Sequence, residues 1–217
     1  VQPKMLFVIA DGPRLNNPND YERCQAARAI IETIDWDCQL LTNYSETNLG
    51  CGKRVATGID WVFEHVDEAI ILEDDCLPDR SFFRFCCEML ELFQQDDRVM
   101  MISGTNHLSS WKKDLQSYHF SLYGGAWGWA TWKRAWRFYD YEMKNWDNPL
   151  VQEKVLKTLG DPSQFDHVNS LIQKLFNGKV SAWDYQWTWA CLLRSGLSIV
   201  PSVNLVSNIG FGPSATH

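Results

Sequence analysis

Residues 69–79 read AIILEDDCLPD. Four apolar residues are followed at once by three acids, Glu73, Asp74 and Asp75, with no basic residue beside them. A short apolar run of this kind is typical of a buried strand, so we expect the acids to follow the carboxyl end of that strand.

The first half of the chain alternates strand-like and helix-like patterns. We predict strands within 5–14 and at 38–42, 69–72 and 99–104, and helices at 20–34, 53–65 and 79–93. This alternation predicts a largely parallel sheet with right-handed crossovers, in which ligands bind beyond the carboxyl ends of the strands. Asp11, which follows the first strand, and the acidic triplet are therefore expected on one rim.

Composition narrows the class of protein. The chain has 217 residues, a formal net charge of −7 and 11 tryptophans. This length suits one domain, the negative charge argues against a nucleic-acid partner, and indoles offer flat faces to sugar rings. No apolar run reaches about 18 residues, so we expect no transmembrane segment.

The seven cysteines show no C-x-x-C spacing, which argues against a zinc site. Reduced thiols favour a cytoplasmic location, with peripheral attachment to a membrane or a secretory-pathway lumen as alternatives.

Three acids at a strand end indicate a hard cation. Oxygen ligands suit Mg²⁺ and Mn²⁺, and these ions leave coordination positions for substrate phosphates. Along a strand, Glu73 and Asp75 would point one way and Asp74 the other, which divides their roles. The alternative is a solvated turn whose acids stabilise the start of the helix at 79–93.

Two arginines are candidates for phosphate binding, since guanidinium groups form bidentate hydrogen bonds to phosphate. Arg14 lies on the loop after the first strand, next to Asp11, and Arg54 lies at the start of the helix at 53–65. A surface ion pair and a solvated helix end are the alternatives.

Two aromatic segments in the second half carry further candidates. Gly125, Trp127 and Trp129 lie in GGAWGW at 124–129, where glycine allows close approach of a ligand and indoles offer stacking surfaces. In WDYQW, Asp184 follows Trp183, and an aromatic environment raises the pKa of a carboxyl group and makes it a better base. A core loop and a helix N-cap are the respective alternatives.

In their order along the chain, these pieces resemble a GT-A glycosyltransferase of the N-acetylglucosaminyltransferase I family and its bacterial relatives. The matching motifs are LFVIADGPR, ILEDDCLPDRSFF, YGGAWGWATW, WDYQW and PSVNLVSNIGFGPSATH. The resemblance implies a single GT-A, Rossmann-like α/β domain over 1–217, with a mostly parallel central sheet flanked by helices and a smaller acceptor-side part. Its nucleotide-sugar-binding half would be 1–105 and its acceptor-binding, catalytic half 106–217.

The resemblance also implies roles for individual residues. Asp75 and the C-terminal His217 would bind Mn²⁺ or Mg²⁺, and Asp184 would be the catalytic base. The nucleotide sugar would contact Asp11, Arg14, Arg54, Asp74 and Gly125. The acceptor would contact Trp127, Trp129 and Trp183.

The expected function is an inverting hexosyl- or N-acetylhexosaminyltransferase. It would move a sugar from a nucleotide-diphosphate sugar, with a UDP-sugar expected, to a hydroxyl group of a glycan or other acceptor. A metal-dependent nucleotidyltransferase and a non-catalytic, tryptophan-rich sugar-binding module are the alternatives. The oligomeric state is left open.

Overall fold

The structure is a computed structural model that describes residues 1–109 and 116–211, and it has a mixed α/β architecture. The helices are α1 (Asp20–Ala29), α2 (Gly50–Val62), α3 (Arg80–Leu92), α4 (Lys133–Trp136), α5 (Pro149–Leu159), α6 (Pro162–Phe176) and α7 (Asp184–Leu193). The strands are β1 (Met5–Ala10), β2 (Gln39–Tyr44), β3 (Glu68–Ile71), β4 (Cys76–Pro78), β5 (Val99–Ser103), β6 (Tyr118–Ser121), β7 (Trp129–Trp132), β8 (Leu197–Pro201) and β9 (Val206–Asn208).

The central sheet has five strands in the order β3-β7-β5-β8-β6. Only β5 and β8 are parallel, while β3–β7, β5–β7 and β6–β8 are antiparallel. The prediction of a mostly parallel central sheet is therefore wrong. The reason is that β7, whose sequence WATW was read as part of a glycine-rich loop, inserts between the two strands of the first half.

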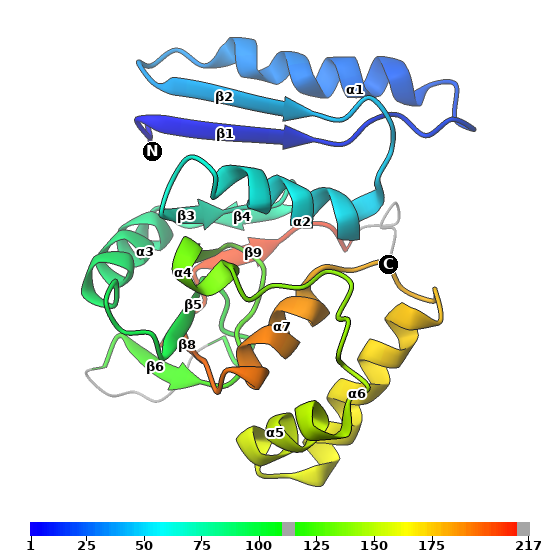
Figure 1. Cartoon of the computed structure of the whole chain (residues 1–217). Coiled ribbons are helices and arrows are strands. Elements are labelled where there is room, and N and C mark those ends of the chain that lie inside the picture. The colour runs from blue at the N-terminus through cyan, green and yellow to red at the C-terminus, as the bar shows by residue number, and fades with distance from the viewer. Residues whose placement is uncertain (110–115, 212–217) are drawn as a thin grey trace.

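β1 and β2 form a separate parallel pair, in register from Met5–Gln39 to Ala10–Tyr44. Figure 1 shows this pair between α1 on one side and α2 on the other. α2 approaches closely because Gly58 has no side chain, and a methyl group there would overlap Ile9. The pair thus joins the body of the protein through α2.

Hydrophobic side chains cover both faces of the central sheet. On the α3 face the buried residues include Phe82, Cys86 and Ile102, and on the α7 face they include Trp129, Trp136 and Trp187. Burying aromatic rings of this size contributes strongly to the hydrophobic stabilisation of the sheet. Most of the tryptophan-rich segments are therefore core-forming.

Capping residues next to the helix ends explain where several helices begin and end. Asp79 caps α3 by accepting a hydrogen bond from the backbone N–H of Ser81 at 2.8 Å, as its position before the helix predicts. Two helices, α5 and α6, follow one another with a short connection between them. Gly160, at φ +68°, ends the first, and Asp161 caps the second.

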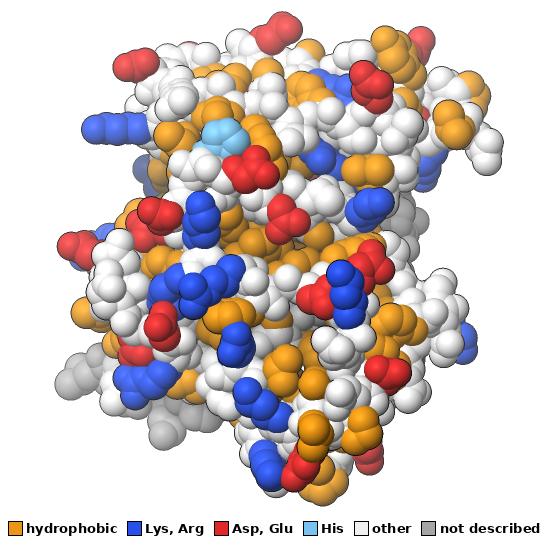
Figure 2. Space-filling view, in the orientation of Figure 1, with side chains coloured by type: hydrophobic (Ala, Val, Ile, Leu, Met, Phe, Trp, Pro, Cys, Tyr) orange, Lys and Arg blue, Asp and Glu red, His pale blue; other side chains and the backbone are white. Residues whose placement is uncertain are grey.

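The surface is mixed in charge on the face drawn in Figure 2, where basic and acidic side chains are interspersed and hydrophobic side chains group across the middle. Among the described helices, none has the length and apolar character needed to cross a bilayer. The seven cysteines are all free thiols, of which Cys86 and Cys191 are buried.

Candidate functional site

The acidic triplet lies in a turn between β3 and β4. The backbone N–H of Cys76 donates to the carbonyl of Glu73 at 3.1 Å, which closes the turn around Asp74 and Asp75. The triplet thus follows the strand instead of extending it, so strict strand alternation does not set its directions. Exposure still divides the acids, since Glu73 and Asp75 are half-buried and Asp74 is exposed.

Asp184 brings a fourth carboxylate to the triplet. It is the first residue of α7, and its negative charge acts on Glu73 together with the charges of Asp75 and Asp74. Burial, the largest cause, and the three neighbouring charges together raise the pKa of Glu73 from an ordinary 4.5 to about 7. The charges of residues more than 100 positions apart in sequence therefore act on one carboxyl group, and we call Glu73, Asp74, Asp75 and Asp184 together the acidic cluster.

Trp183 connects the two parts of the acidic cluster. Its side chain donates a hydrogen bond to the Glu73 carboxylate, and its carbonyl accepts one from the Tyr139 hydroxyl at 3.1 Å. Burial raises the pKa of Tyr139, so this hydroxyl stays protonated and keeps donating. These two bonds fix the N-terminal end of α7 beside the acids.

The C-terminal segment also reaches the acidic cluster. β9 pairs with β4, and the backbone N–H of Ile209 donates to the Asp75 carbonyl at 2.9 Å. A methyl group on Gly210 would overlap the Asp75 carboxylate unless that side chain moved, so Gly210 leaves the Asp75 side chain its present position. The segment up to Phe211 therefore lies next to the predicted metal ligand, and His217 lies outside the described residues.

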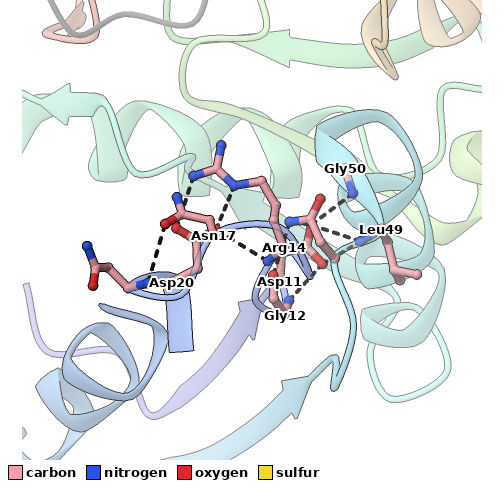
Figure 3. Close-up of polar contacts among 9 residues, drawn as sticks. Asp11, Gly12, Arg14, Asn17, Asp20, Leu49 and Gly50 are labelled. Atoms are coloured by element: carbon pink, nitrogen blue, oxygen red, sulfur yellow. Dashed lines mark hydrogen bonds and ion pairs between the residues drawn. The ribbon is translucent and has the colours of Figure 1, made fainter. Parts of the chain in front are cut away.

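The Asp11 carboxylate forms hydrogen bonds to backbone N–H groups at the start of α2 (Figure 3). Its carboxylate accepts hydrogen bonds from the N–H groups of Leu49 at 2.8 Å, Gly50 at 2.9 Å and Gly12 at 2.8 Å. A carboxylate at a helix N-terminus satisfies otherwise unpaired donors and interacts favourably with the helix dipole. Asp11 thus ties the end of β1 to the start of α2.

The two predicted phosphate-binding arginines also have partners within the chain. Arg14 forms a bidentate pair with Asp20, with Nε 2.6 Å from Oδ2 and one terminal nitrogen 3.1 Å from Oδ1 (Figure 3). Arg54 is buried, and its guanidinium donates to the carbonyls of Ala10 and Asn43. Arg54 therefore joins the ends of β1 and β2, and nucleotide binding by either arginine stays a prediction.

Gly125 and Trp127 lie in the loop before β7. Gly125 exchanges hydrogen bonds with the Ser103 hydroxyl, and a side chain there would overlap Thr105. Trp127 is half-buried, with its ring edge-on to those of His107 and Phe211. Trp127 therefore keeps part of its ring accessible beside the C-terminal segment.

The other two predicted acceptor-binding tryptophans are buried. Trp129 is fully buried and Trp183 is 4% exposed, and their rings stack with centroids 5.2 Å apart. Trp136 and Trp187 pack against the same rings. This arrangement makes Trp129 and Trp183 the support on which the acidic cluster rests, and contact with an acceptor stays a prediction.

The acidic cluster offers the type of ligand atom that a hard divalent cation prefers. Its donors are carboxylate oxygens, and none of the ion pairs between described residues involves the acidic triplet. The same described ranges contain no group of three or more His, Cys, Asp or Glu side chains arranged to hold a metal by themselves. Asp75 would therefore need ligands from outside these residues, such as phosphate oxygens and water.

Two residues at this site were given no role from sequence. Glu73 was assigned only a direction, although its position at the end of an apolar run was a signal for burial. Gln186 is 5% exposed on α7, and a polar residue inside an otherwise apolar helix was its signal.

Replacing Asp11 by Ala is expected to lower the free energy of unfolding by about 2 kcal/mol, because three backbone N–H groups lose a charged acceptor. Urea unfolding without nucleotide measures this, with the exposed Asp37→Ala as the control. Unchanged unfolding of Asp11→Ala would show that its bonds to α2 contribute nothing to the fold.

Glu73→Gln is expected to change how stability depends on pH. The native pKa of Glu73 is raised, so folding binds a proton between about pH 4.5 and pH 7, and wild-type stability falls as pH rises through that window. Above about pH 7 the variant should be more stable than wild type, by up to about 3 kcal/mol, and below about pH 4.5 the two should agree.

Thermal unfolding from pH 4 to pH 8 in EDTA, which keeps the protein free of metal, measures this difference. Parallel stability curves for the two proteins would contradict the burial of an uncompensated Glu73.

No protein-family model matches the chain, and a search of curated proteins finds no matching sequence. The candidate site therefore rests on the geometry of the chain's own residues.

Proposed function

We propose that the protein is a metal-dependent glycosyltransferase that moves a sugar from a nucleotide-diphosphate sugar to an acceptor hydroxyl with inversion. The observation that carries the proposal is the acidic cluster, in which Asp184 on α7 meets the triplet after β3. The charges of three carboxylates acting on a fourth, with no ion-pair partner for the triplet among the described residues, favour a cationic ligand.

The proposed fold is one GT-A domain. The two predicted halves share the central sheet, since β3 and β5 come from the first and β6, β7 and β8 from the second. Sharing a sheet supports a single folding unit in which the acidic rim of one half faces the aromatic core of the other. A UDP-sugar is the proposed donor on the strength of the sequence resemblance.

The roles of the carboxylates follow from their exposure and position. Asp74 is exposed at the tip of the turn, where it is free to accept hydrogen bonds from the ribose or the donor sugar. Asp75, half-buried against Gly210, is the proposed metal ligand. Mn²⁺ or Mg²⁺ held there would offset the charge of the leaving diphosphate.

Asp184 is the proposed general base. Its carboxylate accepts the proton of the acceptor hydroxyl while that oxygen bonds to the anomeric carbon. The bond from the anomeric carbon to the diphosphate breaks on the opposite face, and the diphosphate takes the electron pair. The bonds from Trp183 to Glu73 and Tyr139 hold the base in place for this step.

Asp184→Asn is expected to lower the rate of sugar transfer at least about 100-fold, because an amide cannot accept the proton. Binding of the donor should stay within about threefold of wild type, since the same shape is kept. Release of nucleoside diphosphate from a panel of UDP-, GDP- and dTDP-sugars, with Mn²⁺ and simple methyl glycosides as acceptors, identifies the donor and then compares the variant with wild type.

Asp166→Asn, on the exposed surface of α6, is the matched control. Wild-type transfer by Asp184→Asn would remove Asp184 as the base. If wild type released nucleotide from none of the donors, the glycosyltransferase proposal itself would fail.

A further inference from the structure

A cavity of about 270 Å³ borders the N-terminal end of α7, and no role has yet been assigned to it. Its walls come from the segment after α4, the end of α6 and the segment before α7. They include Tyr141, Glu142, Met143, Phe176, Ser181 and Gln186. This volume lies near the lower end of the range for small-molecule sites, which suits one ring better than an extended chain.

Gln186 is the unusual residue of this cavity. Its side chain is 5% exposed, and its amide nitrogen donates to the Ala182 carbonyl at 3.0 Å. That bond fixes the orientation of the Gln186 amide, because only its nitrogen, and not its oxygen, can donate a hydrogen bond to a carbonyl. The Oε1 atom is buried and has no hydrogen-bond partner among the described residues.

A buried carbonyl without a donor is costly, and such groups in native proteins are normally paired with a ligand or an ordered water. Gln186 also borders a second cavity of about 190 Å³, and Met143 separates the same two spaces. Met143 is buried at φ +45°, a strained conformation for a residue with a side chain. A strained backbone at Met143 and an unpaired acceptor at Gln186 therefore lie at the same wall between the two cavities.

The chemistry of the larger cavity fits a sugar ring. The aromatic rings of Tyr141 and Phe176 offer apolar faces, and Phe176 is 51% exposed while stacked on Trp146. Glu142, Ser181 and Gln186 offer oxygen acceptors to hydroxyl groups. A pyranose presents both kinds of surface, apolar C–H faces and a rim of hydroxyl groups.

We infer that this cavity binds one pyranose ring, one of whose hydroxyl groups donates to Gln186 Oε1, and that this ring is the acceptor sugar. The second part rests on the proposed function. It is supported by the chain order, because Ser181 and Ala182 line the cavity directly before Trp183 and Asp184. Tyr139, two residues before the cavity-lining Tyr141, also donates to the carbonyl of Trp183, the residue before the proposed base.

Gln186→Met tests the inference because methionine keeps the volume and shape but removes the acceptor, together with the amide N–H that donates to Ala182. Saturation-transfer NMR with methyl glycosides of glucose, galactose, mannose and N-acetylglucosamine, without donor or metal, is the assay. Wild type should bind at least one of them, and Gln186→Met should weaken that binding at least about tenfold. Phe176→Ala, which alters an exposed side chain, should weaken the same binding, while the exposed Gln173→Met should not.

Thermal unfolding separates a ligand role from a structural one. Removing the unpaired buried carbonyl offsets the loss of the hydrogen bond to Ala182, so the Tm of Gln186→Met should stay within about 4 °C of wild type. A large fall in Tm, or failure of wild type to bind any of the four glycosides, would overturn the inference. If an ordered water, and not a sugar, pairs with Gln186 Oε1, wild type should bind none of the four glycosides.

The outcome for the proposed function is separate. One outcome is that wild type releases nucleotide from a donor but binds no glycoside. That outcome would support the glycosyltransferase proposal and show that this cavity is not its acceptor site. Glycoside binding that depends on Gln186, without turnover of any donor, would keep the sugar site and remove its assignment to an acceptor.

Discussion

The repulsion within the acidic cluster is the constraint on which the rest of the site depends. Glu73 is half-buried next to three other carboxylates, and burial together with their charges brings its pKa to about 7. A protein that only had to fold would gain by replacing one of these acids with a neutral side chain. Their retention in one place is explained if a cation and a diphosphate complete the charge balance.

The tryptophan core makes this arrangement rigid. Trp129 on β7 stacks on Trp183, and Trp183 binds Glu73 through its side chain and Tyr139 through its carbonyl. The position of α7 relative to the acidic turn is thus set by ring packing and two hydrogen bonds. Placing a reactive carboxylate on a helix end with this support limits its motion, which proximity-based catalysis requires.

The sequence predicted local elements better than their assembly. The helix start at Asp79 and the strand before the acids follow from capping and hydrophobic patterns, which are local. The N-cap alternative for Asp184 is wrong, because Trp183 occupies the N-cap of α7 and Asp184 is its first helical residue. The antiparallel insertion of β7 was missed because WATW is too short and lacks the alternation of polar and apolar residues that marks a strand. It also follows a glycine-rich segment, which favours a loop. The pairing of Arg14 with Asp20 and the helix-capping bonds of Asp11 were missed because an ionic side chain shows its type, and not its partner, in sequence.

The most direct measurement of the central claim is calorimetric binding of UDP, GDP and dTDP with and without Mn²⁺, in wild type and in Asp75→Asn. The account predicts that a nucleoside diphosphate binds wild type only when Mn²⁺ is present. It also predicts that Asp75→Asn weakens that binding at least about tenfold, whereas the exposed Asp37→Asn does not. Equal binding with and without Mn²⁺, or an unchanged affinity in Asp75→Asn, would contradict the account.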